Sequence, residues 1–396
     1  MLLRIIVAWI LVSSSVLVNA ADGEWSGYIA TEWRSFIDSP ADPVQRGDNT
    51  SLSAQAEYYR DWNAGKQSFR FTPFLRIDGR DNQRSHFDIR ELNWTSVHDD
   101  WELTAGIGKV FWGVTESQHL VDIINQTDLI ESIDGEEKLG QLMLKLNLAQ
   151  DWGNIDLYVL PGFRERTFPS RTGRLRSQAA VAVNNAEYAS SQARDHVDAA
   201  IRWSHSVGDW DVGLSHFSGT SRDPRFRPAI DKGRAVLIPV YETIDQTGLD
   251  LQATKDDWLW KLEVISRSGQ GERYTAATGG FEYSLYGIYE SAVDLGLIAE
   301  YLFDDRDELS ATPFEDDLFL GARLAFNDEA SSELLAGMIV DLDNGSRVLS
   351  VEGSRRIGDN WKINLEARFF SNIDPQDSLV NFEKDDFVQL ELAWYF

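Results

Sequence analysis

The chain lacks cysteine entirely, although it is 396 residues long. This absence excludes a disulfide framework, a cysteine-ligated zinc site and a cysteine nucleophile. Basic residues are also scarce, because 37 lysines and arginines stand against 64 aspartates and glutamates, which gives a formal net charge of -27. Surfaces that bind nucleic acid need clustered Lys and Arg to neutralise phosphates, so we expect no nucleic-acid partner.

Long apolar runs are missing as well, except at the start of the chain. Residues 1–4 form a short basic start, residues 5–18 are apolar apart from serines, and Val18-Asn19-Ala20 has the small residues of a secretory cleavage site. We therefore expect a signal peptide over 1–20 and a single mature domain over 21–396. A run of about 14 apolar residues is too short for a membrane-spanning helix, which needs about 20. An exported chain without such a helix is periplasmic, secreted or an outer-membrane barrel.

Short alternating segments are what the chain does contain. Apolar and polar residues alternate with a period of two over segments of about 9 to 12 residues, which is typical of membrane-spanning β-strands. The pattern predicts an all-β fold, a transmembrane antiparallel up-and-down β-barrel of about 18 strands with an error of about two. The predicted strands are 25–34, 52–59, 69–78, 87–97, 101–111, 142–150, 155–163, 197–207, 210–218, 247–254, 258–268, 274–286, 293–303, 318–326, 334–342, 347–357, 361–370 and 387–396.

Tryptophan follows many of the shortest connections. In Asp61-Trp62 and Gly208-Asp209-Trp210, Asp and Gly suit a turn and Trp suits the headgroup level of a membrane. We expect these residues to form half of an aromatic girdle at one end of the barrel. The alternative is a soluble β-sandwich in which Trp is buried after turns, but a sandwich would not alternate its loop lengths in this way. The expected girdle comprises Trp62, Trp101, Trp152, Trp210, Trp258, Trp361 and Phe396.

The connections between the short turns are long and irregular. In outer-membrane barrels the periplasmic turns are short and the extracellular loops are long, so we assign the short turns to the periplasm. The last strand ends on the aromatic Phe396 and resembles the signal that the barrel-assembly machinery recognises. We expect an integral protein of the Gram-negative outer membrane, with lipid, lipopolysaccharide and that machinery as partners. The long connections are 36–50, 112–138, 164–195, 219–241, 304–313 and 371–386.

One face of each predicted strand should contact lipid and the other should face water. In 142–148, four leucines lie on one face, whereas Met143, Lys145 and Asn147 lie on the other. A Lys or Arg that faces lipid near the bilayer centre costs about 2 to 4 kcal/mol, so we assign the charged faces to the lumen. Acidic residues share those faces. The basic residues expected in the lumen are Arg70, Arg76, Lys145, Arg202, Lys261, Arg323 and Arg368.

The connection 112–138 is the best candidate for a constriction inside the barrel. It carries isoleucine and leucine, which an exposed loop seldom contains, so we expect part of it to pack inside. A barrel of this size encloses water unless a loop fills it, so this connection would set the width of the passage. The constriction residues that we expect are Trp112, Glu116, Asp122, Asn125 and Asp128.

The same stretch carries a family resemblance. A glycine at the end of a strand, Gly108, is followed by Trp112-Gly113, by the acidic Glu116 and by an Ile-Asn-x-x-Asp run that contains Asn125 and Asp128. This arrangement resembles the loop of large Gram-negative porin-like barrels of the alginate-export family and their uncharacterised large-barrel relatives. The resemblance covers 108–128 directly, with general barrel architecture over the rest of the chain. It implies a passive channel.

Two of the long loops are basic although the chain is acidic. Arginine forms forked, charge-assisted hydrogen bonds with carboxylate or phosphate, so loops that fold inward would attract anionic solutes. The alternative is that these arginines bind lipopolysaccharide phosphates or stay solvated. The clusters are Arg164, Arg166, Arg171, Arg174 and Arg176 in one loop and Arg222, Arg225 and Arg227 in the next.

Candidates for catalysis or metal binding are weak. The acidic runs 304–308 and 315–317 would most simply bridge divalent cations at the surface, and they do not define a site. His205 and His216 have serines nearby and could imitate the Ser-His pair of a barrel hydrolase, but no third orienting group has a recognisable spacing. We expect no enzyme, no catalytic residue, no cofactor and no metal site.

The sequence therefore predicts a porin-like channel for the passive diffusion of small or extended polar solutes, with a slight preference for anions. Small-molecule solutes are the expected ligands. The main alternative is a structural or interaction barrel without an open pore, such as an adhesin, a receptor or a lipopolysaccharide-organising protein. A barrel hydrolase is the third possibility.

Overall fold

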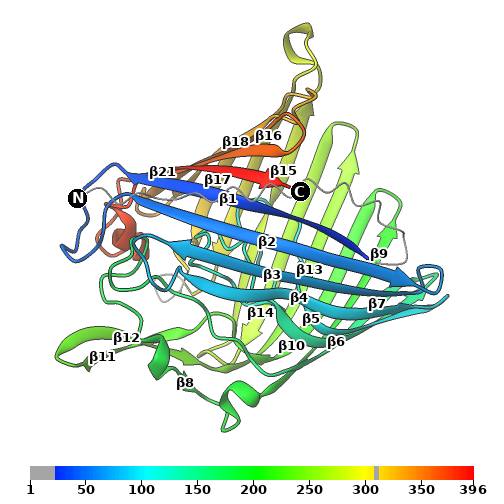
Figure 1. The fold of residues 1–396 in the computed structure, drawn as a ribbon, viewed down its shortest axis with the longest axis horizontal. Helices are drawn as coiled ribbons and strands as arrows, with labels where there is room; N and C mark the ends of the chain where they lie inside the picture. Colours follow the sequence, from blue (N-terminus) through cyan, green and yellow to red (C-terminus); the bar gives the residue numbers. More distant parts are fainter. Residues whose placement is uncertain (1–22, 307–311) are drawn as a thin grey trace.

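The structure is a computed structural model that describes residues 23–306 and 312–396 (Figure 1). The expected signal peptide over 1–20 lies outside the described residues. Eighteen strands form one sheet, and β1 pairs with both β2 and β21, which closes the sheet into a barrel. All the neighbouring strands of this sheet are antiparallel, so the predicted up-and-down β-barrel is confirmed.

The barrel strands overlap, one for one, the segments that the sequence predicted. The first half of the barrel consists of β1 (Glu24–Phe36), β2 (Asn49–Trp62), β3 (Gln67–Asp78), β4 (His86–Val97), β5 (Trp101–Gly108), β6 (Gln141–Gln150), β7 (Gly153–Pro161), β9 (Val197–Val207) and β10 (Trp210–Thr220). The second half consists of β13 (Thr243–Lys255), β14 (Trp258–Ser268), β15 (Tyr274–Leu285), β16 (Asp294–Asp304), β17 (Asp316–Ala325), β18 (Glu333–Asp341), β19 (Arg347–Ile357), β20 (Trp361–Ser371) and β21 (Phe387–Tyr395).

The alternation of short and long connections has exceptions in the second half of the chain. At the short-turn end, 286–293 and 326–332 are longer than the other turns. At the opposite end, 269–273 and 342–346 are short. The longest extracellular connections therefore belong to the first half of the barrel.

Two of the long loops carry a small sheet of their own. Strands β8 (Glu187–Tyr188), β11 (Arg225–Asp231) and β12 (Arg234–Tyr241) pair outside the barrel sheet, and the β11–β12 hairpin projects from the barrel in Figure 1. Lys232 and Gly233 join the hairpin with φ angles of 49° and 77°, as a two-residue type I′ turn requires. The prediction of an irregular connection over 219–241 is therefore wrong. The missed signal is a Lys-Gly turn between two apolar runs.

Within residues 23–306 and 312–396, the helical segments are short 3-10 turns in the connections. They are η1 (Val183–Asn185), η2 (Ala193–Asp195), η3 (Ile288–Glu290) and η5 (Ser378–Phe382). The described part of the chain has no helix with the length and apolar character needed to cross a bilayer.

The outer surface of the barrel is apolar. In β6, Leu142 and Leu144 are 47% and 45% exposed, whereas Met143 between them is 4% exposed. The two leucines therefore lie on the outside and the methionine on the inside. An extended apolar surface of this kind is stable against lipid and unstable against water. A closed sheet also leaves no unpaired strand edge, which a bilayer requires.

The aromatic residues expected in the girdle lie at the short-turn end of the barrel. Trp62 ends β2 and is half-buried, Trp152 lies in the turn after β6, and the other four tryptophans begin strands. Phe396 exchanges backbone hydrogen bonds of 3.1 and 3.2 Å with Gly27 of β1. The exposed members are Trp101, Trp152, Trp210, Trp258, Trp361 and Phe396.

Candidate functional site: the barrel lumen and its constriction loop

Residues 109–140 connect β5 to β6 and fold into the barrel, and we call this segment the constriction loop. Its side chains Val121, Ile123 and Ile124 are at most 2% exposed. Together with Trp112 of the same loop, they belong to a hydrophobic cluster whose other buried members come from the inner faces of the neighbouring barrel strands. These members include Met143, Tyr158, Leu160, Phe217, Ile244 and Ile265. One side of the lumen is therefore filled by a packed core.

Asn125 closes the neck of the constriction loop. Its Nδ2 donates to the backbone oxygens of Gly108 at 2.9 Å and Leu139 at 2.8 Å. Its Oδ1 accepts from the backbone N–H of Val110 at 2.8 Å. Because Gly108 and Leu139 lie at opposite ends of the loop, one buried amide joins the two ends.

A buried carboxylate of β14, Glu263, holds the first arm of the constriction loop. It accepts hydrogen bonds from the backbone N–H groups of Val114 at 2.7 Å and Val121 at 3.1 Å. It also accepts from the N–H and the hydroxyl of Thr115 at 3.1 and 2.8 Å. The Glu263 side chain is 0% exposed, so the loop is its source of hydrogen bonds in place of water.

Glu300 of β16 holds the next residues of the same arm. Its carboxylate accepts from the N–H of Glu116 at 2.8 Å and from the N–H and hydroxyl of Ser117 at 2.8 and 2.7 Å. The roles of Glu263 and Glu300 as anchors were not predicted from the sequence. Each could be placed on an inner face by alternation, but the loop groups that they bind are between 142 and 184 residues away in the sequence.

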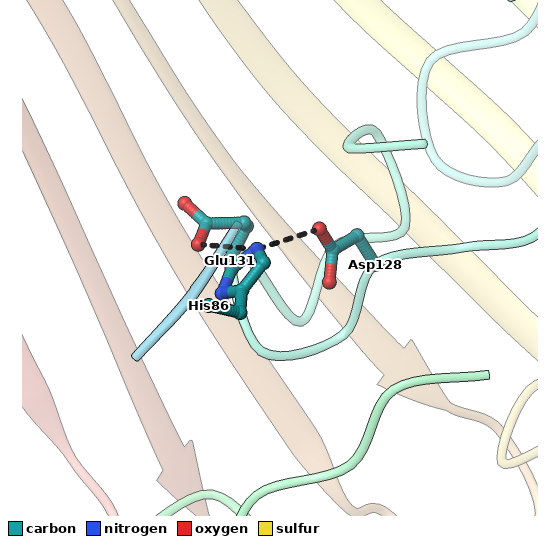
Figure 2. Close-up of side chains that lie close together, drawn as sticks. All are labelled: His86, Asp128 and Glu131. Carbon is teal, nitrogen blue, oxygen red and sulfur yellow. Dashed lines mark ion pairs between the residues drawn. The ribbon is translucent and has the colours of Figure 1, made fainter. Parts of the chain in front are cut away.

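The second arm of the constriction loop is held by β3 and β4. Figure 2 shows His86 of β4 between Asp128 and Glu131 of the loop, with its Nε2 3.7 Å from a carboxylate oxygen of each. Arg90 of β4 donates to Asp128 at 2.7 Å, and Arg76 of β3 lies 2.7 Å from Glu131. Basic side chains of β3 and β4 thus bind two carboxylates of the loop.

His86, Asp128 and Glu131 offer three metal-ligand atoms within 4.8 Å of one another, but their surroundings do not favour a metal ion. Arg76 and Arg90 already donate to both carboxylates, and their positive charges oppose a divalent cation. Burial alone would raise the pKa of Asp128, yet its hydrogen bonds and the charge of Arg90 hold it at about 2. The group therefore works as an ionic clamp between loop and wall.

A buried ionic network beside this clamp joins β1, β3 and the connection after β3. Glu32 of β1 accepts from Arg84 at 2.6 and 2.8 Å and from Arg76 at 2.9 Å. Glu32, Arg84 and Arg76 are 2%, 3% and 5% exposed. Arg84 also donates to the backbone oxygen of Ile130 in the constriction loop at 2.7 Å. The network therefore ties the loop to the barrel where the two ends of the sheet meet.

The seven basic residues expected in the lumen all contact acidic groups of the inner face or of the constriction loop. Arg202 also lies 5.3 Å from the ring of Trp112. The lumen charge is mixed and largely paired. The pairs are Arg70 with Glu57 and Glu91, Arg76 with Glu32 and Glu131, Lys145 with Asp156, Arg202 with Asp250, Lys261 and Arg323 with Glu116, and Arg368 with Asp134, Glu352 and Glu366.

A cavity of about 1270 Å³ lies between the constriction loop and the wall formed by β17–β21 and β1–β3. Of the five expected constriction residues, Glu116 lines this cavity. The side chains of the other four, Trp112, Asp122, Asn125 and Asp128, are buried between the loop and the barrel. Ten acidic residues line the cavity against seven lysines and arginines. The acidic ones are Glu32, Glu116, Glu131, Asp134, Glu136, Glu137, Glu333, Glu352, Glu366 and Glu391, and the basic ones are Arg76, Arg90, Lys109, Arg176, Arg323, Lys362 and Arg368.

His119 links two parts of the constriction loop to β14. Its Nε2 lies 2.7 Å from Glu136, and its Nδ1 lies 3.8 Å from Glu263. Burial alone would lower the pKa of His119, but the hydrogen bond with Glu136 and the negative charge of Glu263 raise it to about 10. The ring is therefore a cation at neutral pH.

Raising the pH is expected to loosen this link. Because the folded-state pKa of His119 lies above its ordinary 6.5, its contribution to stability is complete below pH 6.5 and is lost as the pH rises towards 10. Between pH 7 and pH 10, we expect the free energy of unfolding in urea to fall by about 1 kcal/mol more for the wild type than for His119→Gln. Equal pH dependence of the two proteins would contradict this role of His119.

The arginines of the two basic loops are mostly paired with carboxylates. Arg174 and Arg222 are 7% and 3% exposed and lie 2.5 and 2.6 Å from Asp385 and Asp198. Arg171 instead contributes its backbone oxygen to a neighbouring arginine. The other pairs are Arg164 with Asp88, Arg166 with Asp223, Arg176 with Asp42, Arg225 with Glu242 and Arg227 with Glu187. Most of these arginines therefore have acidic partners within the protein, although Arg171, Arg225 and Arg227 remain exposed. The expectation that these loops attract anions stays a prediction.

His205 and His216 do not form a site with the nearby serines. Successive side chains of a strand lie on opposite faces of the sheet. Ser215 is 5% exposed on the inner face of β10, so His216 lies on the outer face. In β9 the same alternation places Ser204 and Ser206 inside and His205 outside. The structure does not bring these candidate Ser-His pairs together.

Comparisons with known proteins show the fold. No family model matches the sequence, and no curated protein matches it. OccK8 (OprE) of Pseudomonas aeruginosa has a TM-score of 0.53 at 10% identity, over 95% of this chain and 98% of that chain. Wzi of Escherichia coli has a TM-score of 0.53 at 9% identity, over 92% of this chain and 83% of that chain. A variant of Rh. blastica porin has a TM-score of 0.46 at 11% identity, over 94% of this chain and 100% of that chain.

The location of the protein follows from the fold and its surface. Wzi is an outer-membrane protein involved in group 1 capsule assembly and a carbohydrate-binding β-barrel. The chain described here shares that barrel fold and has an apolar exterior between aromatic residues and long loops. Its fold and surface are those of an integral outer-membrane β-barrel with a porin-like architecture. The closer resemblance to the alginate-export family stays a prediction.

Proposed function

We propose that the protein is a porin-like channel through which small or extended polar solutes diffuse passively. The observation that carries the proposal is the cavity of about 1270 Å³ between the constriction loop and the facing wall. The loop fills one side of the lumen with a hydrophobic core and leaves charged and polar groups along the other side. A channel that selects by width and by charge needs a narrowed passage with a polar lining of this kind.

The charges along this passage favour cations. Ten acidic residues line the cavity against eight cationic ones, namely seven lysines and arginines and the protonated His119. The side chains of Glu136 and Glu352 are 53% and 45% exposed, so their charges would act on a passing ion. We therefore propose a weak preference for cations and neutral polar solutes, in place of the slight anion preference expected from the sequence.

Single-channel recording in a planar lipid bilayer tests both parts of the proposal. We expect discrete conductance steps from the refolded chain and a reversal potential, in a potassium chloride gradient, that favours potassium. Glu136→Gln combined with Glu352→Gln should lower the potassium-to-chloride permeability ratio by about twofold. Asp99→Asn, an exposed change in a periplasmic turn, should leave the ratio unchanged.

Two outcomes would contradict the proposal. Folded protein that gives no conductance steps would rule out the channel. A reversal potential that favours chloride in the wild type would restore the anion preference and remove the role proposed for the acidic lining.

A second candidate is an interaction barrel that binds a surface polysaccharide without conducting. Phe226 and Ile230 of the projecting β11–β12 hairpin are 43% and 74% exposed, which is typical of a contact surface. Wzi, which shares the fold, is a carbohydrate-binding β-barrel. Calorimetric binding of a bacterial surface polysaccharide that Phe226→Ala weakens, together with the absence of conductance steps, would favour this candidate.

A further inference from the structure

The extracellular ends of β17 and β18 place two aspartates directly opposite each other. Asp317 and Asp341 are register partners in this antiparallel pair, and they are 2% and 4% exposed. Phe319 and Ile339, two positions along each strand, line the lumen cavity, so both aspartates face inward. Like charges directly opposite each other destabilise a strand pair, so a compensating positive charge is needed here.

Two further carboxylates reach the same place from separate connections. Glu315 immediately precedes β17, and Asp377 is the N-cap of η5 in the β20–β21 loop. The charges that act on Asp317 come from Asp341, Glu315 and Asp377, and all three are negative. Four carboxylates thus form one cluster at the extracellular rim, which we call the rim cluster.

Three carboxylate oxygens of the rim cluster receive no hydrogen bond from the residues that the structure describes. Asp317 Oδ2, Glu315 Oε2 and Asp377 Oδ2 are buried and lack a hydrogen-bond partner among residues 23–306 and 312–396. Burying a charged oxygen without a partner is strongly unfavourable, so each of these groups indicates a missing ligand. Asp341 accepts three hydrogen bonds from the turn that follows it, which fixes it as one side of the cluster. Arg306, at the same rim, forms an ion pair with Asp304 at 2.6 Å, outside the rim cluster.

We propose that the rim cluster binds a divalent cation of the calcium class. Calcium takes six to eight oxygen ligands, largely carboxylates, in a flexible geometry. The three free oxygens would supply the centre of such a site, with Asp341 and water completing the shell. The cluster consists of carboxylates alone, which disfavours metals that prefer nitrogen or sulfur ligands.

The cation would reinforce three extracellular connections that hydrogen bonds already bring together. Asn372 and Asp374 of the β20–β21 loop donate to Gly345 and Ser346 at 2.8 and 3.0 Å. The ligands come from the β16–β17 connection, from β18 beside 342–346, and from η5. Leu379 and Phe382 of η5 line the lumen cavity, so a cation held at Asp377 would fix one side of the channel mouth. In the described residues, the group whose ligand atoms lie within 4.8 Å of one another is His86, Asp128 and Glu131. The oxygens of the rim cluster are farther apart, so we expect these carboxylates to move closer together when the cation binds.

Calorimetric titration of the refolded, chelator-treated full chain with calcium chloride tests the site directly. We expect a dissociation constant on the order of 0.1 to 1 mM, as in extracellular oxygen-ligand sites, and a higher midpoint of thermal unfolding in calcium than in EDTA. Magnesium at the same concentration should give a smaller shift, because it needs a stricter geometry. A wild type that shows neither binding heat nor a calcium-dependent shift would overturn the proposal.

Two substitutions separate cation binding from simple protonation of the carboxylates. Asp317→Asn should weaken calcium binding by about tenfold or more, because affinity follows the charge of the ligands. In EDTA the same variant should unfold at a higher temperature than the wild type, because one repulsive charge is gone. Asp343→Asn, an exposed change in the adjacent turn, is the matched control and should bind calcium like the wild type. Stabilisation by Asp317→Asn with no calcium response in the wild type would mean that protonation alone relieves the cluster, which would also overturn the proposal.

Discussion

Replacing Glu263 and Glu300 together by alanine is expected to release the first arm of the constriction loop and to enlarge the conductance of the barrel. Glu263 accepts four hydrogen bonds from the loop, and Glu300 binds two successive loop residues. A hydrogen bond to a charged group contributes about 1.5 to 3 kcal/mol, so a loss of about 3 kcal/mol is a conservative figure. That loss would change the ratio of docked to released loop by about 100-fold.

The measurement is a comparison of single-channel currents. The double alanine variant should show larger mean conductance and more current noise than the wild type, and its loop should become sensitive to protease in the folded barrel. Glu263→Gln with Glu300→Gln keeps one acceptor oxygen at each position and should give an intermediate result. Glu91→Ala, which removes a lumen carboxylate 3.5 Å from Arg70, is the control that leaves the loop anchors intact. Wild-type currents from the double alanine variant would mean that the hydrophobic cluster alone holds the loop.

Glu32→Gln is expected to lower the free energy of unfolding by about 3 to 5 kcal/mol. The substitution removes the charge that Arg84 and Arg76 share, and the three side chains are between 2% and 6% exposed. Removing one partner from a buried ion pair is strongly destabilising. Arg76 keeps Glu131 and Arg84 keeps Asp78 as partners, so we expect the loss at the lower end of this range. Urea unfolding in lipid vesicles, followed by tryptophan fluorescence, measures the loss.

The matched control for this substitution is Glu57→Gln. Glu57 pairs with an arginine of the lumen too, but its Oε1 lies 3.8 Å from Arg70 Nε. The side chains of Glu57 and Arg70 are 34% and 42% exposed. Its loss should cost less than about 1 kcal/mol. If Glu32→Gln cost no more than this control, water or neighbouring carboxylates would have to satisfy the two arginines.

The strands could be predicted from the sequence because alternation is a local property. Every barrel strand follows from a period of two in its own residues, and Trp after a short turn marks the periplasmic end without knowledge of the partner strand. The β11–β12 hairpin is equally local but was not predicted. Its first strand, Arg225–Asp231, contains two arginines and a proline and lacks a regular apolar alternation, so its clearest signal is the turn at Lys232 and Gly233.

The contacts of the candidate site could not be predicted in the same way, because they join residues that are far apart in the sequence. That 112–138 enters the lumen followed from its isoleucines, but its anchors are carboxylates on strands far along the chain. The basic loops show the limit most clearly, because Arg174 finds its partner Asp385 211 residues away. A cluster of arginines in a sequence looks like free positive charge until the fold supplies the acidic partners.

The pairing of β1 with β21 has a consequence for how the barrel is made. Register partners such as Tyr28 and Tyr395 come from opposite ends of the sheet. Until β21 is in place, the growing sheet keeps two unpaired edges that would readily join other chains. Such distant pairing also makes folding slow. We therefore expect the protein to depend on periplasmic chaperones during its export. A variant that weakens the pairing of β1 with β21 should accumulate as aggregates before it shows any defect in conduction.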